Sequence, residues 1–257
     1  MHLPPKLIVA PTLARMARIY EQSRSGGRNS PRFAAYLAEA EHHWGLASYN
    51  PMAGDAAAVA VSALLALDAE LVAAAAAQGA LEVCGWSQTI TLAVVVATPG
   101  MWTDRLATEI RHRTVADRRD AHGEILLWAG DPPAVHTIER ESVAEAVRTM
   151  WTSLHGPTFT LGAVLAREGL AYAIGRDSAP IGPPNPRVSE AVDVLGDTSS
   201  LGDIVAVLYG DAAAIALGYT PLGLPERAGC EWAIVRAAER IARMGAMQAL
   251  RETPPQI

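Results

Sequence analysis

Two short runs rich in β-branched and aliphatic residues constrain the fold of this chain more than any other feature. They are Thr89 to Val96 (TITLAVVV) and Glu124 to Trp128 (EILLW). Each has the length of a strand and is followed by the Gly and Pro residues that end strands. The segments on both sides of this region have helical character. The order of helices, a small strand region and more helices predicts a predominantly helical α+β protein, with a small sheet packed on helices.

Apolar spacing, capping residues and helix-breaking prolines and glycines place the helices. We expect them at about 12–22, 31–43, 55–79, 103–113, 139–154, 160–171, 187–195, 200–208 and 225–250. The loop 177–186 contains four prolines and is the clearest internal break, which suggests a lid or a joint. We expect a single domain over 1–257; a division into an N-terminal helical part, 1–85, and a second part, 86–257, is the alternative.

Composition and charge narrow the class of protein. The chain has 257 residues, of which 50% are hydrophobic and 19% are charged, so it is globular rather than disordered. Alanine is abundant and aromatic residues make up only 5%, which favours close contacts between helices. The net charge of −6 argues against a protein that follows nucleic-acid phosphates.

Two further features bear on the cellular compartment. The most apolar window, 56–81, is dominated by alanine and contains Asp68 and Glu70, which favours a buried helix over a membrane span. Cys84 and Cys230 lack metal-type spacing, so we expect buried free thiols. We therefore expect a cytoplasmic protein of bacterial type that binds neither nucleic acid nor a membrane.

Residues 137–172 contain the pattern most relevant to function. Glu141, Ser142 and Glu145 lie on one predicted helix, at the positions where a zinc peptidase has His-Glu-x-x-His. The i, i+4 spacing puts Glu141 and Glu145 on the same helix face, as it does for two zinc-binding histidines. Arg148 follows one turn later, and Glu168 lies on the next predicted helix, where a third ligand is expected.

Two interpretations of these acidic residues stay open. In one, the three carboxylates bind a hard cation such as Mn²⁺, Mg²⁺ or Ca²⁺. In the other, which we favour, Glu141 and Glu145 are solvated or form ion pairs with nearby arginines. The candidate partners are Arg140, Arg148 and Arg167.

The second half of the chain resembles the predicted zinc-dependent proteases of the HExxH, glutamate-zincin type. That family has a strand, an active-site helix that ends with an arginine, and a helix of pattern T-L-x-x-x-L-x-x-E-G-L-A that supplies the third ligand. The matching stretches are 124–128, the helix with Arg148, and Thr160 to Ala171 (TLGAVLAREGLA). Farther on, Tyr209-Gly210-Asp211 and Leu224 to Cys230 (LPERAGC) resemble the family's F-G-D and P-R-W-A-G-Y segments.

The resemblance implies a zincin-like fold, with the strands near 89–96 and 124–128 beside the active-site helix. It does not carry the activity with it, because both histidines are absent. The position of the general base is Ser142, which cannot take a proton from water unaided. Among the family's ligands only Glu168 is matched. We therefore expect no zinc, no other cofactor and no conventional peptidase activity, with a hard divalent cation left as the open alternative.

We predict a zincin-like protein that has lost HExxH zinc-peptidase chemistry and binds a ligand, peptide or partner in the remaining cleft. The alternative is an enzyme repurposed on the same scaffold, with carboxylate acid–base chemistry on a small molecule, with or without a hard metal ion. A third hypothesis is that the resemblance is accidental and the chain is a helical interaction protein. The candidate catalytic residues are Glu141, Glu145 and Glu168, and the candidate pocket residues are Trp128, Arg148, Trp151 and Arg227.

Overall fold

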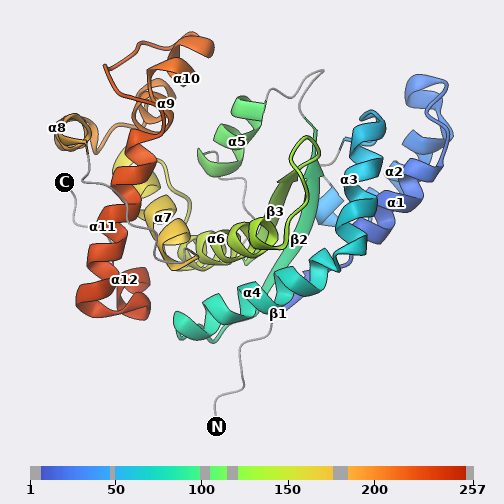
Figure 1. Ribbon diagram of the computed structural model, residues 1–257, viewed down its shortest axis with the longest axis horizontal. Helices are drawn as coiled ribbons and strands as arrows, with labels where there is room; N and C mark the ends of the chain where they lie inside the picture. Colours follow the sequence, from blue (N-terminus) through green and yellow to red (C-terminus); the bar gives the residue numbers. More distant parts are fainter. Residues whose placement is uncertain (1–6, 47–49, 99–104, 115–120, 176–184, 253–257) are drawn as a thin grey trace.

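The computed structural model describes residues 7–46, 50–98, 105–114, 121–175 and 185–252. Within these ranges the chain forms twelve α-helices and one three-stranded parallel sheet (Figure 1). The predicted class, predominantly helical α+β with a small sheet, is confirmed.

The sheet has the order β1-β2-β3, with β1 at Leu7–Ala10, β2 at Ile90–Ala97 and β3 at His122–Trp128. Leu7 pairs with Ile90, and Thr91 pairs with His122. The central strand β2 is buried along almost its whole length, which explains its uninterrupted apolar sequence. Among the described residues β3 pairs with no strand other than β2, so it is an edge strand of the sheet.

The helices before β2 are α1 (Leu13–Glu21), α2 (Pro31–Ala40), α3 (Asp55–Ala66) and α4 (Ala69–Val83), with short 3₁₀ turns at Gly27–Asn29 and Trp44–Leu46. Between β2 and β3 lies α5 (Arg105–Thr114). The later helices are α6 (Val135–His155), α7 (Leu161–Ile174), α8 (Pro186–Leu195), α9 (Leu201–Tyr209), α10 (Asp211–Ala216), α11 (Ala228–Met244) and α12 (Ala246–Arg251). Helices α4 and α6 lie side by side against the sheet (Figure 1).

The single helix expected at 55–79 is wrong, because α3 and α4 are separate helices bent by 64°. The break is at Asp68, whose φ of 49° lies in the left-handed region and cannot continue a helix. Glu70 then accepts hydrogen bonds at 2.7 and 2.8 Å from the backbone nitrogens of Thr12 and Leu13, which ties the start of α4 to the start of α1. Among the described residues no single helix is long and apolar enough to cross a membrane; only this bent pair reaches that length and composition.

Two other predictions need correction or restriction, and one strand was missed. The helix expected at 225–250 is interrupted at Gly245, whose φ of 82° ends α11 before α12 begins. The strand β1 was not predicted, because four apolar residues show no periodicity that separates a strand from a helix. Residues 176–184, which form most of the proposed proline-rich lid, lie outside the described residues.

The buried apolar residues form two clusters. The first contains side chains from β2, β3, α1, α3, α4, α6 and α12, so the N-terminal helices share a core with the strands and α6. The second contains side chains from α5 and α8 to α11. Helix α7 contributes to both, with Leu170 in the first cluster and Leu161 in the second. The candidate site lies where the two clusters meet.

Candidate functional site

The active-site-like helix α6 lies directly on β3, and Gly123 makes this approach possible. A Cβ atom at Gly123 would lie 2.4 Å from Thr149 Oγ1 and 2.7 Å from Glu145 Oε1, closer than such atoms can approach. The backbone nitrogen of Glu124 donates to Glu145 Oε1 at 3.1 Å. The buried Glu145 carboxylate is therefore held against the backbone of β3.

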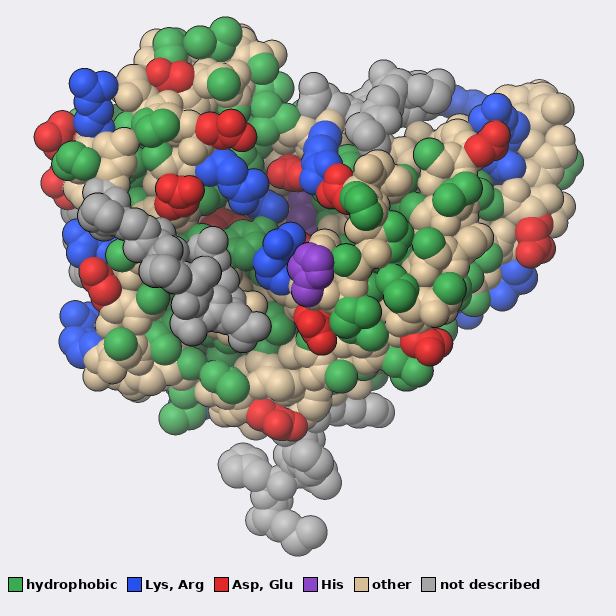
Figure 2. All heavy atoms as spheres, in the orientation of Figure 1, with side chains coloured by type: hydrophobic (Ala, Val, Ile, Leu, Met, Phe, Trp, Pro, Cys, Tyr) green, Lys and Arg blue, Asp and Glu red, His purple; other side chains and the backbone are tan. Residues whose placement is uncertain are grey.

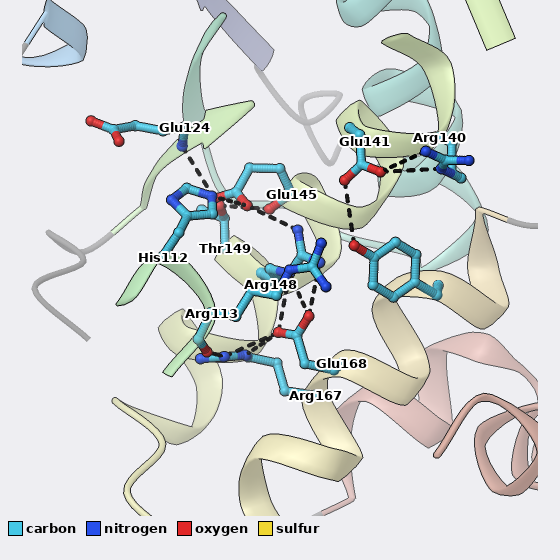
Figure 3. A network of polar contacts seen from close by, with 11 residues as sticks. His112, Arg113, Glu124, Arg140, Glu141, Glu145, Arg148, Thr149, Arg167 and Glu168 are labelled. Carbon is cyan, nitrogen blue, oxygen red and sulfur yellow. Dashed lines mark hydrogen bonds and ion pairs between the residues drawn. The ribbon is translucent and has the colours of Figure 1, made fainter. Parts of the chain in front are cut away.

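Arg148 links Glu145 on α6 to Glu168 on α7 (Figure 3). Its Nη1 atom lies 3.3 Å from Glu145 Oε2, and its Nε and Nη2 atoms donate to Glu168 Oε2 at 3.0 and 2.8 Å. The side chains of all three residues are at most 3% exposed. The position between the two carboxylates, where the resemblance would put a zinc ion, is thus occupied by a guanidinium group.

Arg167 completes this buried network. It donates from Nε to Glu168 Oε1 at 3.0 Å, from Nη1 to Thr158 Oγ1 at 2.7 Å, and from Nη2 to the backbone carbonyl of Arg113 at the end of α5. Burial alone would raise the pKa of Glu168, but the charges of Arg148 and Arg167 outweigh it and hold that pKa at about 2. Glu168 is therefore ionised at neutral pH and fully engaged.

Glu141, the third predicted catalytic carboxylate, lies apart from this network (Figure 3). It accepts a hydrogen bond from Arg140 Nε at 3.1 Å and one from the Tyr172 hydroxyl at 3.4 Å. The structure therefore brings Glu145 and Glu168 to one arginine and leaves Glu141 in a separate pair. In the part of the chain that the structure describes, no group of three His, Cys, Asp or Glu residues could hold a metal ion.

A pocket of about 380 Å³ is lined by residues of β3, of the segment that follows it, and of helices α3, α5, α6, α7 and α11. Pockets of this size suit a small organic molecule. Figure 2 shows a hollow near the middle of the molecule, where basic, acidic and histidine side chains gather. Three of the predicted pocket residues, Trp128, Arg148 and Arg227, line the pocket.

Trp151, the fourth predicted pocket residue, is not among the residues that line this pocket. Its side chain is 1% exposed, belongs to the first apolar cluster and lies 4.3 Å from the ring of His155, measured between centroids. Arg148 and Trp151 are three residues apart on α6, yet of the two only Arg148 lines the pocket.

The sequence analysis missed the pocket residues on α5. Arg105, Glu109 and Arg113 all line the pocket, and their i, i+4, i+8 spacing puts them on one helix face. A charged stripe of this kind could have indicated a polar pocket wall, although a helix face in contact with water gives the same pattern. Tyr172 and Cys230 line the pocket as well, and no local pattern distinguishes them.

Arg105 fastens α5 to the end of β3 at the mouth of the pocket. It donates to both oxygens of Asp131 at 2.7 and 2.8 Å and to Glu109 at 3.1 Å. Its guanidinium carbon also lies 4.9 Å from the centre of the Trp128 ring. This bidentate pair closes one side of the pocket.

The two C-terminal segments that resemble the protease family lie against each other. The backbone nitrogen of Arg227 donates to the carbonyl of Tyr209 at 3.2 Å. Asp211 accepts hydrogen bonds from the backbone nitrogens of Leu222, Gly223 and Leu224 at 2.8 to 3.2 Å. A Cβ atom on Gly210 would lie 2.4 Å from the carbonyl oxygen of Pro225, so the close contact requires glycine. These contacts set the start of α11 at the edge of the pocket.

Comparison of the chain with models of known protein families, with characterised proteins and with solved structures finds no match. The resemblance to the HExxH proteases therefore rests on the residues of the second half of the chain. Of the segments that carry it, those in β3, α6 and the start of α11 contribute residues to the lining of one pocket.

Proposed function

We propose that this chain is a zincin-like protein that has lost HExxH zinc-peptidase chemistry and binds a small organic ligand or a short peptide in the pocket beside β3. The observation that carries the proposal is the pocket itself. Its lining includes residues of β3, α6 and the start of α11 that belong to the segments resembling the protease family, and Arg148 stands between two of the predicted ligand positions.

The arrangement of the frame supports the zincin-like part of the proposal. An edge strand of the described sheet, β3, lies beside α6, and α7 follows with Glu168 directed toward α6. A helical interaction protein with an accidental resemblance would not need an edge strand next to this helix. The close contact of Gly169 with the backbone of Ala233 also gives a physical reason for the Glu-Gly pair in the matched segment.

Ser142 supports the loss of the peptidase chemistry. It occupies the position of the general base, is 0% exposed, and donates its hydroxyl hydrogen to the carbonyl of Ile138 at 2.6 Å. A buried hydroxyl that donates within its own helix has no access to an attacking water.

The alternative, carboxylate acid–base catalysis, has less support. Glu141, Glu145 and Glu168 each form an ion pair with an arginine, and only Glu141 lines the pocket. Two carboxylates that share a site shift each other's pKa, but here an arginine separates Glu145 from Glu168 and keeps Glu168 ionised.

The proposal is tested by a titration that reports on the pocket directly. We expect members of a mixed library of small molecules and short peptides to shift the ¹H–¹⁵N indole signal of Trp128, which lines the pocket, and to leave that of the buried Trp86 unchanged. Thr137→Trp fills the pocket from α6 and should abolish the shift, whereas Glu139→Trp, on the exposed face of the same helix, should not.

Two results would contradict the proposal. One is a library in which nothing shifts Trp128 or in which Thr137→Trp has no effect. The other is a calorimetric zinc titration that shows tight one-to-one binding, abolished by Glu145→Gln or Glu168→Gln, because that would mean the metal chemistry has been kept.

A further inference from the structure

Two arginines on different helices, Arg113 and Arg148, line the pocket. Glu145 and Glu168 pair with Arg148 and do not line the pocket themselves. Among the described residues Arg113 forms no ion pair, and its Nη1 atom is buried without a hydrogen-bond partner. A guanidinium with a buried, unsatisfied donor and no paired carboxylate is unfavourable, so this position favours the entry of an anion.

Arg113 and Arg148 approach the same aromatic ring. Their guanidinium carbons lie 5.3 and 5.1 Å from the centre of the Tyr172 ring, and both residues line the pocket. Arg148 is paired with both Glu145 and Glu168, whereas Arg113 has no paired carboxylate among the described residues. Of these two guanidinium groups, the one that keeps a donor for an anionic ligand is therefore that of Arg113.

The neutral neighbours of Arg113 cannot supply the missing charge. Burial raises the pKa of Tyr172, of Tyr209 and of the Cys230 thiol, so all three stay protonated at neutral pH. Tyr209 also has a buried hydroxyl without a hydrogen-bond partner.

Three of the acidic residues that line the pocket are paired with an arginine. Glu109 and Asp131 are held by Arg105, and Glu141 is held by Arg140. The Nε2 atom of His112 lies 3.6 Å from Oε2 of the buried Glu145. Glu124 and Glu231 also line the pocket, so the lining as a whole is not positive. The preference for an anion is therefore confined to the part of the pocket beside Arg113 and Arg227.

A second arginine stands at the start of α11. Arg227 lines the pocket and forms no ion pair among the described residues. Its φ of 58° lies in the left-handed region, which residues with a side chain rarely adopt. Strain of this kind persists where a function or the surrounding structure requires it. Arg227 precedes a helix of 17 residues without a side-chain cap, whose first backbone N–H groups add positive potential. Cys230 lies close enough to Arg113 and Arg227 for both charges to act on its thiol.

We propose that the pocket binds its ligand through an anionic group, a carboxylate or a phosphate, which lies between Arg113 and Arg227 beside Cys230 and the ring of Tyr172. This inference rests on the proposed function of the pocket as a ligand site and specifies the chemistry of that ligand. The pocket volume of about 380 Å³ limits the ligand to a small organic acid or phosphate ester.

The test uses four probes that share a phenyl ring and differ in charge: benzoate, phenyl phosphate, benzyl alcohol and benzylamine. Each is titrated into the full chain, with the indole signal of Trp128 as the readout. We expect at least one anion to bind at least about tenfold more tightly than the alcohol or the amine. The order of benzoate and phenyl phosphate then distinguishes a carboxylate site from a phosphate site.

Variants assign the effect to the two arginines. Arg113→Gln and Arg227→Gln should each weaken binding of the preferred anion by about tenfold or more. Arg236→Gln is the matched control, because Arg236 is on the same helix as Arg227 but is 51% exposed and paired with Glu239; it should change the affinity by less than about twofold. If Arg113→Gln does not fold, the test uses Arg227→Gln, because Arg227 is exposed and its substitution should not prevent folding.

The outcomes separate the two proposals. Equal binding of neutral, cationic and anionic probes, or anion binding that Arg227→Gln leaves unchanged, overturns the anionic group while the pocket remains a ligand site. If no probe and no library member shifts Trp128, both the ligand site and its anionic preference fail.

Discussion

Arg148 and Arg113 both lie near the ring of Tyr172. Arg148 and the two carboxylates that pair with it form what we call the closed network. The surroundings of Arg113, which has no carboxylate partner among the described residues, are what we call the open region. Arg148 has Glu145 on one side and Glu168 on the other, with every contact inside the protein. Arg113 contributes a backbone carbonyl to that network, but among the described residues its guanidinium has no carboxylate partner. The two regions lie next to each other, and they differ in whether the arginine is paired with a carboxylate.

An arginine that is paired inside the protein stabilises the fold, whereas an unpaired arginine is available to bind a ligand. A buried arginine with its carboxylates in place holds elements together, here β3, α6 and α7. A buried arginine without them is more favourable once an anion binds. The closed network should therefore respond to mutation through stability, and the open region through ligand affinity.

The largest expected effect is that of Arg148→Met. It leaves the buried Glu145 and Glu168 without their shared partner, which should lower the free energy of unfolding by about 3–5 kcal/mol. The measurement is urea unfolding at pH 7. Arg113→Met is the matched comparison and should destabilise much less, because it leaves no carboxylate unpaired. Equal losses in the two variants would break the distinction between the regions.

Glu168→Gln should lower the free energy of unfolding at pH 7 by about 3 kcal/mol, because its pKa lies at about 2 in the folded chain. A carboxyl with a depressed pKa stabilises the fold above its unfolded pKa of 4.5, and this stability is lost as the pH falls toward 2. Unfolding measured between pH 6 and 2 should show a weaker pH dependence in the variant. A parallel pH dependence in both proteins would mean that Glu168 is not the titrating group.

Local patterns in the sequence predicted the elements and the pairing of Glu141 and Glu145 with nearby arginines, but not the contact that joins α6 to α7. The strand β2 and most helices follow from β-branched runs, apolar spacing and capping residues. The ion pair of Arg148 with Glu168 joins residues that are 20 positions apart on two helices, and neither helix reveals it alone.

Arg113 was missed for a related reason. On its own helix it resembles any solvated basic residue, and only the packing of α5 onto α7 buries it. The breaks at Asp68 and Gly245 were missed because the apolar pattern continues across both positions, while the backbone there is left-handed. The site thus depends on tertiary placement, which no periodicity encodes.

Gly123→Ala tests whether the closed network needs α6 to lie directly on β3. The added methyl group would lie within 3 Å of Thr149 Oγ1, Glu145 Oε1 and a methyl group of Leu92, which should lower the free energy of unfolding by about 1–3 kcal/mol. Urea unfolding measures it. Gly130→Ala is the control, since a Cβ atom there meets nothing within 4 Å. A similar loss in both variants would show that the effect comes from the backbone rather than from the contact.

Arg227→Gly should separate stability from binding in the open region. Glycine adopts a φ of 58° without strain, so the free energy of unfolding should rise by about 0.5–1 kcal/mol. Affinity for the preferred anionic probe should fall at the same time, because the charge is removed. Thermal unfolding and the Trp128 titration measure the two effects. A variant that is both less stable and unchanged in affinity would assign Arg227 to the closed, structural class.

The smallest expected effect is that of Arg140→Met, which removes an ion pair at the surface. Arg140 is 47% exposed, and Glu141 keeps its hydrogen bond from the Tyr172 hydroxyl. Exposed pairs contribute little because water and salt screen them, so the free energy of unfolding should change by less than about 0.5 kcal/mol. The same urea series measures it, at low and at high salt. A loss of unfolding free energy close to that of Arg148→Met would mean that Glu141 belongs to the closed network of Arg148, Glu145 and Glu168.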